Sequence, residues 1–276
     1  MLTATVLALV AAFLHAGWNL LIKTADDRDL AAWGQFVFGG IVLLPVLVWT
    51  GLPTAAAVWF LVPSALIHVV YVWALVAAYD HGDFSLAYPL ARGGGALVAA
   101  LLAALALGDR LGLGGWAALL VVTIGLASLI QPGAPRIEVV YALLTAVLIG
   151  TYTVIDAAGA RHTSNGFAYG VVLTALSGFA LTIAGIARGR GTAFVASLRT
   201  SWPRYLLSGI CLATAYSLVL VAVKYAAVGY VATLRESSVV IGAALGWLFL
   251  KERLGGRRLA SAAVVTAGLV ALVLSQ

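Results

Sequence analysis

Long apolar runs separated by short polar stretches extend along the whole 276-residue chain. A bilayer core about 30 Å thick needs about 20 apolar residues for each crossing helix, so each run predicts one membrane-spanning helix. The runs lack the two-residue alternation that is typical of a transmembrane β-strand. The pattern predicts an all-α polytopic membrane protein with ten transmembrane helices, at residues 2–22, 30–50, 57–79, 85–107, 113–131, 138–159, 166–187, 205–226, 228–250 and 256–275.

The connections between these segments are short, and the longest covers residues 188–204. It carries four arginines around Phe194, Val195 and Leu198. Two interpretations fit this stretch, an amphipathic turn in the membrane interface and an ordinary loop. The first segment, 2–22, has no basic stretch before it and no small-residue cleavage motif, so we expect a resident helix rather than a signal peptide.

Composition supports the same class of protein. Hydrophobic residues make up 63% of the chain and charged residues 9%, against about 25% charged residues in a soluble domain. Intrinsic disorder needs the opposite composition, and the single cysteine, Cys211, excludes a disulfide scaffold. The net charge of +6 comes mainly from the short connections, which favours a role in membrane orientation over nucleic-acid binding.

Lysine and arginine are unevenly distributed between the two sides of the predicted bundle. Eleven lie in the connections after odd-numbered segments, and three lie on the other side. Cytoplasmic connections carry the excess of positive charge, so this count alone places both termini outside the cytoplasm. Ten spans put the two termini on one side of the membrane in either orientation.

The chain contains an internal repeat. Residues 75–130 align without gaps to 218–273, and 17 of the 56 aligned pairs are identical. The strongest match pairs the turn at 108–112, Gly-Asp-Arg-Leu-Gly, with the turn at 251–255, Lys-Glu-Arg-Leu-Gly. The chain is therefore predicted to consist of two five-helix repeats, with residues 1–131 forming the first and 132–276 the second.

An odd number of helices in each repeat has a geometric consequence. The second copy must cross the membrane in the opposite sense, which relates the two halves by a pseudo-twofold axis in the membrane plane. Secondary transporters use such inverted repeats because exchanging the conformations of the halves alternates access, with the substrate near the midplane.

Two five-helix units, each with one of these turns before a last helix with a central glycine, resemble the EamA-type branch of the drug/metabolite transporter superfamily. The motif at 15–19, His-Ala-Gly-Trp-Asn, resembles the tryptophan-containing start of that unit. The resemblance covers essentially the whole chain and implies export of small metabolites, often amino acids, from bacterial cells through the inner membrane. It also implies cytoplasmic termini, opposite to the charge count, so the orientation stays open.

Ionisable residues within a membrane span are costly and point to function. Arg92 and Arg235 each lie seven residues into a span, and the repeat maps one onto the other. Two guanidiniums could thus face a central cavity from opposite ends and bind a carboxylate or phosphate. Glu236 could receive a substrate ammonium. The alternatives are snorkelling or internal pairing for the arginines, and pairing with Arg92 or Lys224 for Glu236.

Polar and aromatic residues at helical spacing predict the lining of that cavity. Interhelical hydrogen bonding and interface anchoring are the competing roles for such residues. The candidates of this kind are His15, Trp18, Asn19, His68, Tyr71, Tyr88 and Tyr152.

Glycines mark predicted sites of close helix packing. Gly93, Gly94 and Gly95 follow Arg92 directly, where they either weaken the helix as a hinge or let a neighbour approach. Gly242 and Gly246 form a small-xxx-small motif that could join the two halves or a second protomer.

The leading hypothesis is a secondary transporter of a small molecule, amino acids including aromatic ones above all, working as a monomer or homodimer. Other metabolites, drugs, sugar nucleotides and organic anions are alternative substrates. No phosphate-binding loop, HExxH or GxSxG motif occurs, so we expect no enzyme, no cofactor and no metal. Proton coupling through Glu236, His15, His68 or Asp156 and facilitated diffusion stay equally open, and a non-transporting membrane scaffold is the remaining class.

Overall fold

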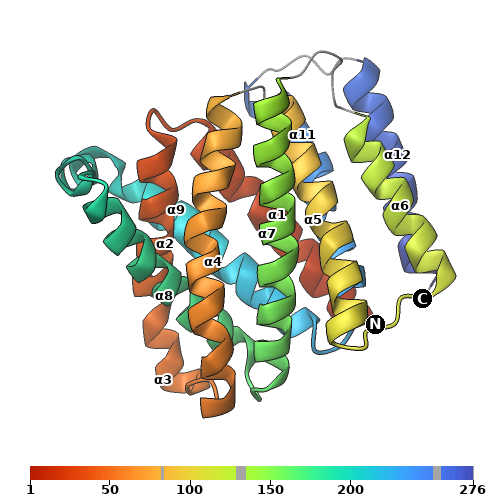
Figure 1. Cartoon of the computed structure of the whole chain (residues 1–276), viewed down its shortest axis with the longest axis horizontal. Helices are drawn as coiled ribbons and strands as arrows, with labels where there is room; N and C mark the ends of the chain where they lie inside the picture. The colour runs from red at the N-terminus through yellow and green to blue at the C-terminus, as the bar shows by residue number, and fades with distance from the viewer. Residues whose placement is uncertain (82–83, 129–134, 251–255, 276) are drawn as a thin grey trace.

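The computed structural model describes residues 1–81, 84–128, 135–250 and 256–275. This part of the chain is helical and contains no strand (Figure 1). The helices lie side by side in a bundle, with α6 and α12 paired at one edge. Their bounds are α1 Leu2–Lys23, α2 Arg28–Leu43, η1 Leu44–Val46, α3 Leu47–Thr50, α4 Ala55–Asp80, α5 Phe84–Ala106, α6 Leu113–Ala127, α7 Arg136–Arg161, α8 Gly166–Ala187, α9 Gly191–Ala222, α10 Val228–Arg235, α11 Ser237–Leu250 and α12 Gly256–Leu274.

Each predicted apolar segment coincides with one helix or with consecutive helices. Within the described ranges, six helical stretches are long and apolar enough to cross a bilayer. They are Leu2–Ile22, Arg28–Thr50, Ala55–Ala78, Arg136–Arg161, Gly166–Ala187 and Gly191–Ala222. Three shorter apolar stretches lie in α5, α6 and α12. The chain is thus a polytopic helical protein, and ten crossings stay a prediction.

The segment predicted at 228–250 is divided into two helices. Helix α10 ends at Arg235 and α11 begins at Ser237, with Glu236 between them. The Glu236 N–H bonds to the carbonyl of Thr233, and the hydroxyl of Ser237 donates to the carbonyl of Leu234 at 2.8 Å. Serine side chains compete with the helical ladder for backbone carbonyls. A break at this point is therefore explained by local hydrogen bonds, and the apolar pattern gave no sign of it.

The stretch 188–204 is helical over most of its length rather than an ordinary loop. Helix α9 begins at Gly191 and continues through it. The reason is aromatic packing: the ring of Phe194 stacks on Trp33 of α2 at 4.0 Å between centroids and faces Tyr205 at 6.0 Å. Buried aromatic pairs of this kind stabilise the helix that carries them.

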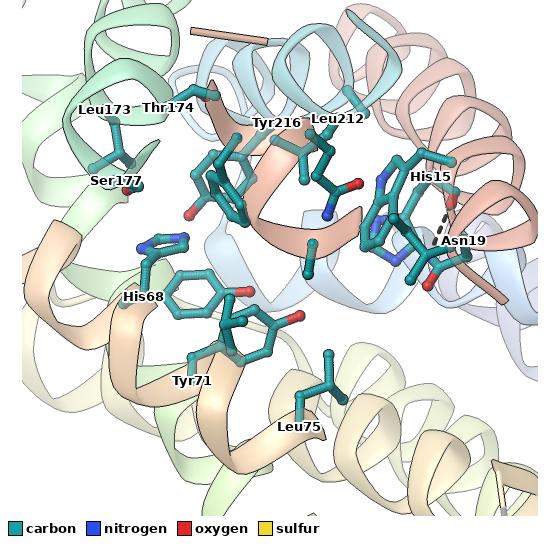
Figure 2. A pocket seen from close by; sticks show the side chains of 18 of the residues that line it. His15, Asn19, His68, Tyr71, Leu75, Leu173, Thr174, Ser177, Leu212 and Tyr216 are labelled. Carbon is teal, nitrogen blue, oxygen red and sulfur yellow. Dashed lines mark hydrogen bonds between the residues drawn. The ribbon is translucent and has the colours of Figure 1, made fainter. Parts of the chain in front are cut away.

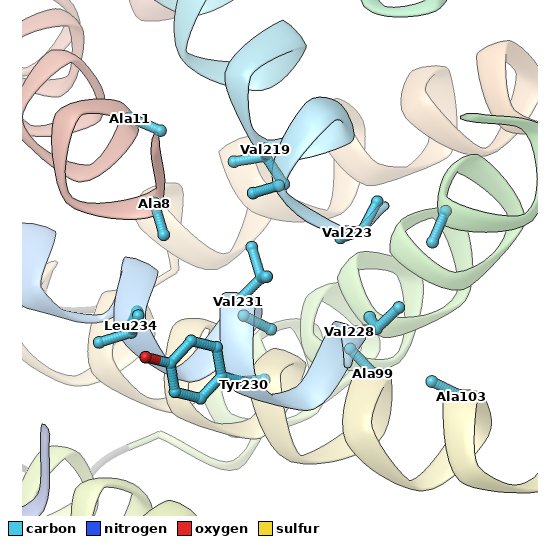
Figure 3. Close-up of a cluster of buried hydrophobic side chains, with 14 of the residues drawn as sticks. Ala8, Ala11, Ala99, Ala103, Val219, Val223, Val228, Tyr230, Val231 and Leu234 are labelled. Atoms are coloured by element: carbon cyan, nitrogen blue, oxygen red, sulfur yellow. The ribbon is translucent and has the colours of Figure 1, made fainter. Parts of the chain in front are cut away.

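The largest core cluster is built from small residues. Alanines of α1 and α5 meet valines of α9 and α10 around Tyr230 (Figure 3). Small side chains let helix backbones approach closely in a membrane protein. The hydroxyl groups of Tyr230 and Thr5 are 2.7 Å apart and tie α10 to α1.

Helices α6 and α12 pack against each other reciprocally. A Cβ added at Gly125 would lie 2.9 Å from Val265, and one added at Gly268 would lie 2.8 Å from Val122. The internal repeat equates Gly125 with Gly268 and Val122 with Val265. A contact in which each copy presents the same pair of residues to the other is the signature of twofold packing.

Ion pairs join the first and second halves of the sequence at both ends of the bundle. At the end where α5 and α7 finish, Asp109 binds Arg161 through two hydrogen bonds of 2.6 and 3.0 Å and accepts the N–H of Val228. At the opposite end, Arg190 pairs with Asp27 and Asp29 (Figure 1).

Candidate functional site

A cavity of about 80 Å³ lies among helices α1, α2, α4, α7, α8, α9 and α10. Seven of the ten residues predicted to bind substrate line it, and Figure 2 shows several of them from close by. The seven are His15, Trp18, Asn19, His68, Tyr71, Tyr152 and Arg235. Residues distant in sequence and on four helices are thus brought together at one place.

The cavity reaches the surface at one end of the bundle. Arg28, the first residue of α2, is exposed and lines the cavity together with Ile22 near the end of α1. The Asp109–Arg161 pair lies at the opposite end and does not line it. The structure is therefore open toward the end that carries the α1–α2 connection.

Arg235 is the buried cation of this cavity. It occupies the last position of α10, is 6% exposed, and has its guanidinium carbon 5.7 Å from the ring centroid of Tyr216. Among the described residues it makes no hydrogen bond and no ion pair. A cation held over an aromatic face is only partly compensated. A guanidinium in this setting suits a planar anion such as a carboxylate.

Arg92 and Glu236 bind each other instead of lining the cavity. Their side chains form an ion pair of 2.8 Å, and both are almost completely buried. The pair links α5 to the break between α10 and α11. The prediction that both arginines face one cavity is therefore wrong for Arg92. Both side chains are buried inside the protein, but Arg92 forms the internal ion pair that was the alternative expected from the sequence. Lys224 donates elsewhere, to the carbonyls of Thr163 and Ser164.

Four rings form the aromatic wall of the cavity. His68 lies 4.2 Å from Tyr152 and 5.9 Å from Tyr216 between ring centroids, and Tyr71 lies 5.4 Å from Tyr152. Their edges and faces present both apolar surface and hydroxyl groups. Such a wall can contact a mixed-polarity molecule with a large side chain.

The α1 residues form a second wall. The rings of His15 and Trp18 meet edge to face at 4.7 Å, and the amide nitrogen of Asn19 donates to the carbonyl of His15 at 2.8 Å. That bond uses one of the two N–H donors of the amide, and no hydrogen bond to the Asn19 side-chain oxygen occurs among the described residues. The predicted shared face of these three residues is what places them together.

Several lining residues were not predicted from the sequence, namely Gln35, Phe36, Thr174, Ser177, Leu212 and Tyr216. Gln35 could have been predicted, because an amide side chain within an apolar span is costly and points to function. Ser177 and Thr174 could not, because serine and threonine hydroxyls are commonly satisfied by their own helix, as Thr174 is by the carbonyl of Gly170.

Asp156 lies behind the aromatic wall. It is fully buried and accepts hydrogen bonds from the hydroxyls of Tyr216 at 2.5 Å and Tyr169 at 3.2 Å. The carboxylate therefore fixes Tyr216, whose ring lies against Arg235.

The predicted glycine positions divide into two groups. Helix α5 runs unbroken through Gly93, Gly94 and Gly95, and a Cβ at Gly95 would lie 2.6 Å from Ile149 of α7. Close packing rather than a hinge explains them. Gly242 has no described atom within 4 Å of its Cβ position, so no tight contact with the other half is seen there, and packing against a second protomer stays a prediction. The surroundings of Gly246 and the side chain of Tyr88 lie outside what the structure describes.

Comparisons with known proteins concern the family and the fold of the chain. The profile of the EamA-like transporter family matches residues 136–274. No curated protein sequence matches the chain. Of 29 matching chains of solved structures, one titled "Crystal structure of protein" superposes with a TM-score of 0.79 over 99% of each chain, at 18% identity. At that identity the likeness concerns the fold alone.

Proposed function

The chain belongs to the EamA-like transporter family, and we propose that it exports small carboxylate-bearing metabolites, amino acids above all, by alternating access. Membership makes it a multi-pass membrane protein that moves a small molecule through the bilayer, rather than an enzyme. The bacterial inner membrane and a monomeric or homodimeric state belong to the proposal. The sequence also resembles one member, the bacterial amino-acid exporter YddG, but the comparisons do not support that identity.

Arg235 carries the proposal for the substrate. It is a buried guanidinium on the cavity wall that makes no ion pair within the described part of the chain. Its repeat equivalent, Arg92, is neutralised by Glu236. A charge inside a membrane protein that lacks an ion-pair partner points to a ligand or to ion movement. A carboxylate fits a single guanidinium fork.

The aromatic wall supports substrates with large side chains. The rings of Tyr71, Tyr152 and Tyr216 border the same cavity as Arg235. Aromatic faces contribute contact area at little cost in conformational entropy. Aromatic amino acids combine the required carboxylate with a matching side chain.

Alternating access between two inverted five-helix halves, 1–131 and 132–276, is the proposed mechanism. The reciprocal contact of α6 with α12 supports it, because an inverted repeat predicts such a contact. The ion pairs at the two ends of the bundle, Asp109–Arg161 and Arg190–Asp27, each join one half to the other and are suited to close one end at a time.

Flux of labelled phenylalanine into proteoliposomes tests the proposal. Arg235→Ala should reduce phenylalanine flux at least about tenfold, because a charged hydrogen bond to the carboxylate is lost. Flux of phenylalaninamide, which lacks the carboxylate, should change little. Arg110→Ala, at an exposed arginine outside the cavity, is the matched control and should match wild type in both assays.

Normal transport by a folded Arg235→Ala protein would overturn the assignment. Competition by each of the twenty amino acids and by sugar nucleotides then identifies the substrate class. Inhibition by phosphorylated sugars alone would replace amino acids with another anion, because a guanidinium also binds phosphate.

A further inference from the structure

Two buried polar atoms at the cavity have hydrogen-bonding capacity that the described residues do not use. Gln35 Oε1 on α2 and Ser177 Oγ on α8 have no hydrogen-bond partner among the described residues. Both side chains line the cavity and are 3% and 0% exposed. Leaving a buried acceptor unsatisfied destabilises a fold. Retaining two such groups at one cavity is consistent with a ligand that supplies their hydrogen bonds.

His68 presents a third acceptor to the same region. Its Nδ1 lies 2.9 Å from the backbone carbonyl of Ser64. A carbonyl oxygen can only accept, so Nδ1 carries the proton of the neutral ring and Nε2 is an acceptor. Figure 2 shows His68 and Ser177 at one end of the pocket, with His15 and Asn19 toward the other.

We propose that Gln35, Ser177 and His68 form an acceptor subsite for the amino group of the substrate. This inference rests on the proposed function, because it assigns the second polar end of a ligand whose carboxylate binds Arg235. An ammonium group donates three N–H bonds and accepts none. Three acceptors from three helices match that requirement, whereas a hydroxyl or carbonyl in the same place could not satisfy all of them.

Tyr216 relates the acceptor subsite to Arg235. The guanidinium carbon of Arg235 lies 5.7 Å from the centroid of the Tyr216 ring, and the His68 ring lies 5.9 Å from that same centroid. Arg235 and His68 thus lie around one aromatic ring, and Gln35 and Ser177 line the same cavity. A molecule bound there has its carboxylate near the cation and its donor group near the acceptors.

Binding of phenylalanine and of 3-phenylpropanoate, its deaminated counterpart, to purified protein tests the subsite. Wild type should bind phenylalanine at least about tenfold more tightly than 3-phenylpropanoate. The deaminated acid has no ammonium group, so the acceptors of the subsite stay without a hydrogen bond when it binds. Gln35→Leu and Ser177→Ala should reduce that preference to about twofold and leave binding of 3-phenylpropanoate unchanged.

Ser217→Ala is the matched control. Ser217 Oγ is also buried and without a partner in the described part of the chain, but it does not line the cavity. The control should retain the full preference for phenylalanine. Ser177→Ala removes a single atom, so the test does not depend on Gln35→Leu folding.

Each other outcome has a defined meaning. Equal binding of the two compounds by wild type overturns the subsite and leaves the carboxylate assignment of Arg235 intact. Equal weakening of both compounds in Gln35→Leu and Ser177→Ala also overturns it. Failure of wild type to bind either compound overturns the proposed function, and the subsite with it.

Discussion

Arg92 and Arg235 occupy the same position in the two copies of the repeat, but their surroundings differ. Arg92 sits in an unbroken helix, α5, and forms a buried ion pair with Glu236. Arg235 ends the short helix α10 and faces the cavity against the ring of Tyr216. Of two equivalent sequence positions, one thus makes a structural contact, at Arg92, and the other is a candidate for substrate binding, at Arg235.

The difference fits the proposal that one asymmetric ligand binds between the two repeated halves. Glu236 follows Arg235 directly, yet its carboxylate reaches across to Arg92 of the other half. Adjacent side chains on a helix diverge, so the acid cannot easily neutralise its own neighbour. One arginine is consequently compensated by an ion pair, while the other makes no ion pair within the described residues, which fits the proposed carboxylate site.

The largest expected effect on stability comes from breaking the buried ion pair of Arg92 with Glu236. Glu236→Ala should lower the free energy of unfolding by about 3–5 kcal/mol, because it leaves Arg92 as an uncompensated buried charge. Arg235→Ala should change it by no more than about 1 kcal/mol, the scale of its cation–π contact. Thermal unfolding of both proteins in detergent measures the contrast.

Replacing Arg92 and Glu236 together by leucine provides the control. Removing both charges should recover most of the stability, because well-packed apolar residues often replace a buried ion pair without loss. A stable Glu236→Ala protein beside an unfolded Arg235→Ala protein would reverse the roles assigned to the two arginines.

The next effect concerns how α10 is held. Asp109 accepts the N–H of Val228 at the start of α10 at 2.7 Å and binds Arg161 in two places, so it closes the end of the bundle opposite the cavity mouth. Asp109→Asn should weaken that closure by about 2 kcal/mol. A cysteine at position 226, in a Cys211→Ala background, should then react faster with a water-soluble maleimide.

Asp27→Asn is the comparison for that experiment, because it weakens the ion pair at the other end of the bundle. Labelling at position 226 should stay at the wild-type rate in this variant. Equal acceleration by both variants would show that the two ends do not open independently.

Tyr216→Phe probes the support beneath Arg235. It keeps the ring and removes the hydroxyl that donates to Asp156 at 2.5 Å. Losing this bond should weaken phenylalanine binding about threefold to tenfold, or about 1 kcal/mol, because the ring is no longer fixed. Tyr169→Phe removes the longer 3.2 Å bond to the same carboxylate and should have a smaller effect on binding. If binding titrations show a larger loss for Tyr169→Phe than for Tyr216→Phe, Asp156 does not support the binding site through Tyr216.

The sequence predicted the equivalence of the two arginines but not their difference. The repeat relates position 92 to 235, and apolar flanks predict that both are buried. Which arginine Glu236 reaches depends on the break after α10, where the Ser237 hydroxyl bonds to the carbonyl of Leu234. Aromatic and polar side chains at helical spacing located much of the cavity wall. Ser177 could not be found, because a single hydroxyl has no spacing pattern.

The smallest expected effect compares the glycines beside the two arginines. Gly242 in α11 has open space around its Cβ position, so Gly242→Ala should stabilise the protein by about 0.5–1 kcal/mol through helix propensity. Gly95 in α5 lies against Ile149, so Gly95→Ala should destabilise it by about 1–3 kcal/mol through overpacking. Opposite shifts in unfolding temperature would support a tightly packed helix beside Arg92 and a loosely packed one after Arg235. If Gly242→Ala instead lowers the unfolding temperature, a neighbour such as a second protomer packs against α11, and the contrast between the two helices fails.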